Sequence, residues 1–244
     1  MTYNNQFSMD KYFQKNYGLP QKPSKYVFGK KSLLVLILFC WIWIPLYIIM
    51  TYKTNKEIKE WEEAFEYRRC NWLNEYDKAL EKAFKNMNLY DSALKKLGLV
   101  EDDPDLQAVK PFYISGNLYD GFWRQDTKGK YRTSRREYTY IVFKQDQILF
   151  YRRVLDLLDL ERKKETTLEF FYSDITSVNI STQSITPKNA AADSTSNEIK
   201  ELDVESFILV VPGDKINMAF ESNGNVDESI KGMRTLIRER KLKG

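Results

Sequence analysis

The sequence contains no histidine among its 244 residues. Histidine is the commonest general base and metal ligand at neutral pH, so catalysis that needs Ser-His-Asp, Cys-His or histidine-bound zinc cannot occur within this chain. The sequence also lacks a P-loop, a dinucleotide-binding fingerprint, a cysteine cluster with metal-ligand spacing and a nucleophile elbow. These absences predict a protein that is not an enzyme, needs no cofactor and binds no metal ion.

Neither sign of charge is in large excess, since 38 Lys and Arg face 34 Asp and Glu. The chain is 43% apolar, which predicts one or two folded domains and excludes a wholly disordered or collagen-like protein. The mean hydropathy of −0.54 excludes a transporter with many membrane spans. That average conceals one segment of very different composition.

The exception is an uncharged run from Ser32 to Tyr52. As a helix, its twenty-one residues would reach about 31 Å, close to the hydrocarbon thickness of a bilayer. We therefore predict a transmembrane helix over 32–52 and a single-pass protein of the cell membrane. A cleaved signal peptide is disfavoured, because no small-x-small site follows the run. The residues expected to anchor this helix are Leu33, Trp41, Trp43, Pro45, Tyr47 and Met50.

The orientation of this span is not decided by the nearby cations, because four Lys precede it and five Lys or Arg follow it closely. Cys40 and Cys70 are the only cysteines, and no disulfide framework is expected. The lack of disulfides favours a reducing compartment and hence a cytoplasmic C-terminal part.

Three segments flank the span before the distal domain begins. Residues 1–31 carry six Lys and one Asp without periodicity, which predicts a basic flexible tail, either lying on anionic headgroups or simply solvated. Residues 53–98 have apolar side chains at spacings of three, four and seven, which predicts an amphipathic helical stalk. Its Trp61, Phe65 and Trp72 favour either a coiled-coil homodimer through 54–97 or a helix folded back on its own chain. Residues 99–110 form an acidic linker.

From Pro111 onward the apolar pattern changes to period two. Strands are expected over 112–119, 138–143, 147–155, 167–182, 206–211 and 215–221, followed by a helix that begins near Asp227 or Ser229. Within that helix Ile230, Met233 and Ile237 share one face. The segment 184–201, rich in Ala, Ser, Thr and Asn, is expected to be a mobile loop.

Two stretches of the distal domain resemble a known family. Tyr140-Ile141-Val142-Phe143 with Gln147-Ile148-Leu149-Phe150-Tyr151, and then Phe171-Tyr172-Ser173-Asp174-Ile175-Thr176-Ser177-Val178, are similar to strands of bacterial pleckstrin-homology-like (GRAM-like) domains. The resemblance covers about residues 111–240. It implies a bent antiparallel sheet or barrel capped by a C-terminal helix, with a role in binding lipid or peptide rather than in catalysis. The predicted fold class is thus a transmembrane helix and a long helical stalk, followed by an α+β pleckstrin-homology-like domain over 111–244.

A basic cluster follows the first expected strand, and the candidate anion- or lipid-binding residues are Arg124, Lys128, Lys130, Arg132, Arg135 and Arg136. Lys128-Gly129-Lys130-Tyr131-Arg132 is similar to the K-x-(K/R)-x-R pattern with which eukaryotic pleckstrin-homology domains hold phosphoinositides. A loop with several cations suits phosphate oxygens. The alternative is an exposed hairpin kept soluble by its charge. Nucleic acid is not an expected partner, because the domain is only slightly basic.

The sequence therefore favours a non-catalytic membrane protein that presents a pleckstrin-homology-like domain to a protein or to anionic lipid headgroups. The alternative is a structural or assembly protein that oligomerises through the helix 54–97.

Overall fold

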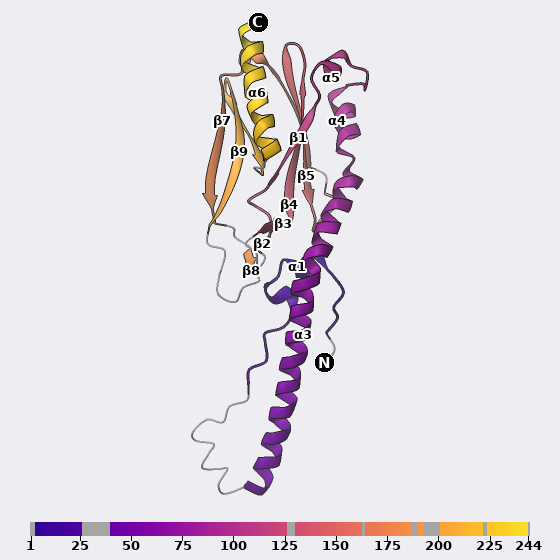
Figure 1. Ribbon diagram of the computed structural model, residues 1–244, viewed down its shortest axis with the longest axis vertical. Helices are drawn as coiled ribbons and strands as arrows, with labels where there is room; N and C mark the ends of the chain where they lie inside the picture. The colour runs from indigo at the N-terminus through magenta and orange to yellow at the C-terminus, as the bar shows by residue number, and fades with distance from the viewer. Residues whose placement is uncertain are drawn as a thin grey trace. The chain divides into compact units, whose positions relative to one another are not determined.

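The computed structural model describes residues 3–25, 40–125, 130–162, 164–186, 190–192, 201–221 and 224–243. The chain forms two compact units, Met1–Asp77 and Lys78–Gly244, and the division between them falls within helix α3, which runs from Cys40 to Met87 (Figure 1). Each unit is described separately below.

The transmembrane prediction is wrong for the residues that the structure describes. None of the helices in this part of the chain combines the length and the apolar character that crossing a bilayer requires. Of the uncharged run, α3 contains only the thirteen residues from Cys40 to Tyr52, which span about 20 Å as a helix, and the charged stretch that starts at Lys53 continues the same helix. The predicted fold class, which began with a transmembrane helix, is therefore wrong for these residues: the structure has a long helix followed by three sheets. The predicted single-pass location in the cell membrane, with a cytoplasmic C-terminal part, is not supported either.

The residues proposed as the membrane anchor fall in two places. Leu33 lies outside the described residues, as do the side chains of Trp41 and Trp43, whereas Pro45, Tyr47 and Met50 belong to α3.

The first unit consists of the N-terminal segment, residues 3–25, and the part of α3 up to Asp77. The segment contains a short helix α1, Met9–Tyr12, and a 3-10 turn η1, Lys15–Gly18. Tyr12 stacks on Tyr76 with ring centroids 5.1 Å apart, and Phe7 meets the edge of Trp72 at 5.5 Å. Aromatic pairs of this kind contribute beyond the area that they bury. Residues 3–25, expected to be flexible, thus have defined contacts with α3.

Side chains of α3 also bind the main-chain carbonyls of the N-terminal segment. Arg68, only 3% exposed, donates from Nη1 to the Tyr17 carbonyl at 2.7 Å and from Nη2 to the Asn4 carbonyl at 2.5 Å. Its guanidinium carbon lies 4.8 Å from the ring centroid of Trp72, within the range of a cation–π contact. Burial lowers the pKa of the Arg68 guanidinium. Trp61 Nε1 donates in turn to the Pro20 carbonyl at 2.8 Å.

These contacts bear on the two arrangements expected for the stalk. Trp61 and Trp72 are 7% and 1% exposed. Their cover comes from the same chain, as in the expectation of a helix folded back on its own residues. While residues 3–25 occupy this aromatic face of α3, a second helix cannot pack on it.

The second unit begins with the last turns of α3, which end at Asn88 in a left-handed conformation with φ 45°. Gly98 ends the next helix with φ 66°, which suits glycine because it has no Cβ. The elements that follow α3 are α4 (Leu89–Leu97), α5 (Pro104–Ala108), β1 (Phe112–Asn117), β2 (Trp123–Gln125), β3 (Tyr131–Thr133), β4 (Arg135–Phe143), β5 (Gln147–Asp156), β6 (Lys164–Phe171), η2 (Tyr172–Asp174), β7 (Ser177–Ile185), β8 (Ala190–Ala192), β9 (Leu202–Val211), β10 (Asp214–Phe220) and α6 (Gly224–Lys243).

The strands form two larger sheets and one small one (Figure 1). A four-stranded antiparallel sheet has the order β1-β4-β5-β6, and a three-stranded antiparallel sheet has the order β10-β9-β7. The small sheet joins β3, β2 and β8, and the β2–β8 pair is parallel. Of the segment 184–201, expected to be a mobile loop, Ser184 and Ile185 end β7 and 190–192 form β8, while 187–189 and 193–200 lie outside the described residues.

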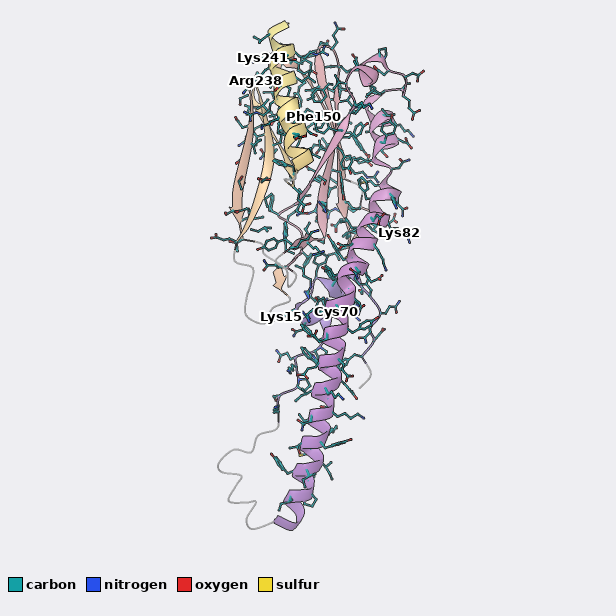
Figure 2. All side chains as sticks on the ribbon, viewed as in Figure 1. Lys15, Cys70, Lys82, Phe150, Arg238 and Lys241 are labelled. Atoms are coloured by element: carbon teal, nitrogen blue, oxygen red, sulfur yellow. The ribbon has the colours of Figure 1, made fainter. Side chains whose placement is uncertain are left out.

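The core lies between the two larger sheets and is completed by α6. Phe150 of β5 lies within it (Figure 2) and is fully buried. Ile230, Met233 and Ile237 of α6 share the face that enters the core, as their spacing predicts. Its other fully or nearly buried members are Ile114, Ile141, Phe143, Ile148, Tyr172, Ile175, Phe207, Leu209, Val211, Ile216, Met218 and Phe220.

The other face of the four-stranded sheet is covered by the end of α3 and by α4. The ring centroids of Phe84 and Tyr138 are 4.8 Å apart, and those of Tyr90 and Tyr140 are 5.9 Å apart. Burial raises the pKa of Tyr140 to about 12, and the neighbouring Tyr90 adds to the shift. Because both faces of this part of the sheet are covered, β4 is apolar or aromatic from Tyr138 to Phe143 except at Thr139.

The two sheets approach each other closely where β1 meets β10. The Glu221 amide donates to the Ser115 carbonyl at 2.8 Å. A Cβ placed on Gly116 would lie 2.2 Å from the carbonyl carbon of Ala219 and 2.3 Å from the amide nitrogen of Phe220. Only glycine fits here, since the obstacles are main-chain atoms that cannot move aside.

We expect Gly116→Ala to lower the free energy of unfolding by about 3 kcal/mol, the upper end of overpacking costs, because β1 and β10 would have to separate. Gly232→Ala is the matched control: position 232 is an exposed helical site with no atom near the added Cβ, so this change should stabilise by about 0.5–1 kcal/mol. Thermal denaturation of the full chain measures both. Equal melting temperatures for the two variants would contradict the close approach.

We expect Arg68→Leu to release residues 3–25, because the two carbonyls bound by the guanidinium lose charge-assisted hydrogen bonds worth about 1.5–3 kcal/mol each. Amide hydrogen exchange between Asn4 and Leu19 should speed up strongly. Arg69→Leu is the control, since the Arg69–Glu66 ion pair is exposed and such pairs contribute at most about 1 kcal/mol. Unchanged exchange in the Arg68 variant would show that the aromatic contacts alone hold the segment.

Candidate functional site

The basic cluster expected to bind anions does not form one exposed surface. Arg124 of β2 and Arg132 of β3 lie opposite each other and are 1% and 6% exposed. Both already interact with other groups of the chain. Lys130 is exposed and also has an interaction within the chain, while Lys128 lies outside the described residues.

The two arginines at the start of β4 are held by carboxylates. Arg135 pairs with Asp120 and, through Nε at 3.3 Å, with Asp156. Arg136 donates from Nη2 to Glu221 Oε2 at 2.5 Å. Each of the two guanidiniums is therefore paired with at least one carboxylate of the chain.

A different polar site emerges on the core-facing side of the four-stranded sheet. Every second residue of β4 points toward the core. At the end of the strand these residues are the apolar Ile141 and Phe143, whereas nearer its start they are the polar Arg135, Glu137 and Thr139. The same change occurs along the other two strands. On β5 the core residues Ile148 and Phe150 give way to Arg152, Val154 and Asp156, and on β6 Leu168 and Phe170 give way to Lys164 and Thr166.

The strand register places the polar positions of the three strands next to one another. Thr139 lies opposite Arg152, which lies opposite Thr166 on its other side. In the next row, Gly116, Glu137, Val154 and Lys164 follow one another across the sheet. The interior of the unit therefore has an apolar half, filled by α6, and a polar half formed by these rows.

A cavity of about 230 Å³ lies in the polar half. Three cations and two carboxylates are among its lining residues, and the cations thus exceed the carboxylates by one. The lining residues are Leu118, Tyr119, Asp120, Arg135, Glu137, Arg152, Val154, Lys164 and Thr166.

Both carboxylates that line the cavity form ion pairs with arginines of the protein. Glu137 is 4% exposed, and its Oε2 accepts from Arg152 Nη2 at 2.6 Å. Its Oε1 accepts from the Ala219 amide of β10 at 3.4 Å, and Arg152 Nη2 also donates to the Asn217 carbonyl at 2.9 Å. Asp120 is held by Arg135.

Three donors in these rows have no partner within the described part of the chain. Thr139 is fully buried, and its Oγ1 has no hydrogen-bond partner there. The Nε of Arg152, directly across from Thr139, is likewise buried and without a hydrogen bond. The exposed Lys164 forms no ion pair with another described residue. Buried polar groups rarely remain unsatisfied, so these donors indicate a place for a further acceptor.

The sequence analysis did not identify Thr139, Arg152 and Lys164 as candidate binding residues. The sequence does contain a sign of a polar site, because on three successive strands the residues of one face change from apolar to polar. It becomes informative only after the register brings the three changes to the same end of the sheet.

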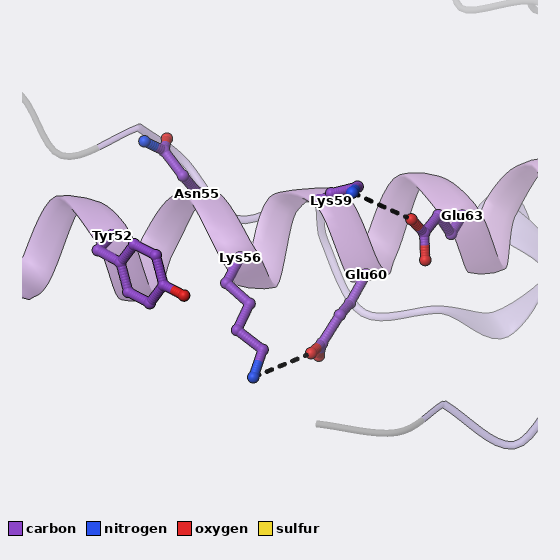
Figure 3. Close-up of a pocket in the computed structure, with 6 residues that line it drawn as sticks. All are labelled: Tyr52, Asn55, Lys56, Lys59, Glu60 and Glu63. Carbon is purple, nitrogen blue, oxygen red and sulfur yellow. Dashed lines mark ion pairs between the residues drawn. The ribbon is translucent and has the colours of Figure 1, made fainter.

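A second hollow, of about 460 Å³, follows one face of α3 in the first unit. Figure 3 shows its six residues, Tyr52, Asn55, Lys56, Lys59, Glu60 and Glu63, with the ion pairs Lys56–Glu60 and Lys59–Glu63, each 3.9 Å long. Pairs of this spacing are typical of the exposed face of a helix. We therefore place the candidate site in the polar cavity of the second unit.

The described residues contain no group of three or more Cys, Asp or Glu side chains arranged to hold a metal ion. No family model, curated protein or solved structure matches the chain.

We expect Arg152→Leu to destabilise the chain by about 3–5 kcal/mol, because it leaves the buried Glu137 carboxylate without its cation. Adding Glu137→Leu to it should recover much of this loss, so a double-mutant cycle should give a coupling of at least about 1.5 kcal/mol. Arg162→Leu, at an exposed position, is the control and should change stability by less than about 0.5 kcal/mol. Additive effects of the Arg152 and Glu137 changes would contradict a coupled pair.

Proposed function

We propose that the chain is a non-catalytic binding protein whose second unit holds an anionic group, a phosphate or a carboxylate, in the polar cavity. The observation that carries this proposal is that Arg152, Lys164 and Thr166, on the neighbouring strands β5 and β6, line the cavity. Among the described residues, Arg152 Nε has no hydrogen-bond partner and Lys164 has no ion pair.

The charges around these donors favour an anion over a neutral ligand. Glu137 and Asp120 are neutralised by Arg152 and Arg135, which leaves the Lys164 ammonium as the uncompensated charge of the lining. An oxyanion accepts several hydrogen bonds at once, and bonds to charged donors are about twice as strong as neutral ones. Part of this gain comes from satisfying the guanidinium of Arg152, whose Nε is buried without a hydrogen bond among the described residues and otherwise destabilises the folded chain.

The order of the elements supports a pleckstrin-homology-like module in this role. β1, β4, β5 and β6 form one antiparallel sheet, β7, β9 and β10 form a second one, and a terminal helix enters the core. Two antiparallel sheets with a terminal helix are compatible with the fold that the sequence resemblance implies. Since α6 fills the apolar half of the interior, the polar half remains for a ligand.

A phosphate reaches such a site either as a free ion or as part of a larger molecule such as an inositol phosphate or a lipid headgroup. The donors recognise the oxyanion that these sources share. Inorganic phosphate, inositol hexakisphosphate and vesicles containing phosphatidylserine therefore serve as three probes of one site, with neutral inositol and phosphatidylcholine vesicles as their uncharged counterparts.

We expect Lys164→Ala and Thr166→Val, two changes in the cavity lining, each to weaken binding of inositol hexakisphosphate by about 10- to 100-fold, because each removes one hydrogen bond to the anion, worth about 1.5–3 kcal/mol for a charged partner. Isothermal titration calorimetry of the full chain measures the dissociation constants. Lys215→Ala, at an exposed position of β10 away from the cavity lining, should bind as tightly as the wild type.

Two results would contradict the proposal: absence of binding by the wild type to all three anionic probes, or equal weakening by the cavity variants and by Lys215→Ala. The second would mean that the anion is held by general surface charge.

A further inference from the structure

The two larger sheets have four edge strands, and on three of them a feature of the structure prevents or discourages pairing with another chain. β1 and β10 meet each other at Ser115 and Glu221. β6 carries Lys164, Glu165 and Glu169, and charged side chains on an edge strand discourage pairing with another chain. β7 is the fourth edge, and within the described residues it pairs only with β9.

β7 itself carries neither of the two side-chain protections common on edge strands, charge and proline. Its sequence, SVNISTQSI, contains no charged residue and no proline over nine residues. None of its residues is buried, and Ile180 is 46% exposed. Such an edge offers a row of main-chain donors and acceptors to another strand.

The last part of β7 also projects beyond the sheet. The pairing of β10 with β9 ends at Phe220 opposite Glu205, whereas β7 continues to pair with β9 as far as Leu202. Residues 183–185 and 202–204 thus form a two-stranded ribbon without a third strand among the described residues. A second chain can approach this ribbon edge-on.

We propose that β7 pairs antiparallel with β7 of a second copy of this chain, about a two-fold axis at Ser181. In this register, Asn179 of one chain lies opposite Gln183 of the other, and Ile180 lies opposite Thr182. Val178 then lies opposite Ser184, and Ser177 opposite Ile185. The strand order of the resulting sheet is β10-β9-β7 followed by β7-β9-β10 of the second copy.

The composition of β7 favours a second copy as the occupant. A two-fold interface places the same strand against itself, so any charge along β7 would meet a like charge near the axis. β7 has no charge, and its centred register pairs amides with amides and β-branched residues with β-branched or small polar residues. The interface is one strand wide, so we expect a dissociation constant in the range of about 10–100 μM.

Charge substitutions at Asn179 and Gln183 test both the dimer and its register. Both residues are exposed, and both lie on the same side of β7. In the double variant N179K/Q183K, lysines oppose lysines across the axis, and the dimer should dissociate. In N179K/Q183E, each lysine opposes a glutamate, and the dimer should persist or tighten by up to about threefold. The two variants carry substitutions at the same positions, so each controls for the other.

Sedimentation equilibrium of the full chain between about 5 and 300 μM measures the association. A wild type that stays monomeric over this range would overturn the proposal. So would a dimer that persists equally in both variants, because it would use another surface. Loss of the dimer in both variants would overturn the Ser181-centred pairing.

Amide hydrogen exchange of the wild type gives an independent measurement that needs no substitution. Protection of Ser177–Ile185 should rise with protein concentration, whereas that of Lys164–Phe171 in β6 should not. Concentration-independent exchange in β7 in a sample that sediments as a dimer would also rule out this interface. The dimer is independent of the anion-binding proposal, since Lys164→Ala and Thr166→Val should leave it intact.

Discussion

The buried Glu137 carboxylate joins the two main sheets at the point where their shared interior changes from apolar to polar. It accepts from Arg152 of β5 and from the Ala219 amide of β10. A buried carboxylate is destabilising unless it is paired and hydrogen-bonded, so the pair fixes where Arg152 lies. With Arg152 held in this way, it lines the polar cavity together with Thr166, its partner on β6, and Lys164, and these are the donors of the proposed anion site.

The strands and the terminal helix are largely readable from the sequence, whereas the site is not. The spacing of Ile230, Met233 and Ile237 shows which face of α6 enters the core, because helix periodicity is a local property. The basic cluster after the first strand is misleading because its partners are distant: Arg136 binds Glu221, 85 residues away. Thr139, Arg152 and Lys164 become neighbours only through strand register, which no local pattern specifies.

Hydropathy alone was also insufficient at the other end of the chain. The uncharged run predicts a membrane span, but its described part continues as α3 into a charged and aromatic helix. The N-terminal segment that packs on this helix has no periodicity of its own. It is bound through main-chain carbonyls by Arg68, Trp61 and Trp72, and carbonyls leave no signature in a sequence. A segment without a pattern is therefore not the same as a segment without structure.

The most direct measurement of the central claim is a crystal structure of the chain grown with inositol hexakisphosphate. We predict a phosphate group in the polar cavity, with oxygens within about 3 Å of the Arg152 guanidinium, Lys164 Nζ and Thr166 Oγ1. A cavity that contains only water at saturating ligand, with phosphate bound elsewhere or not at all, would contradict the account.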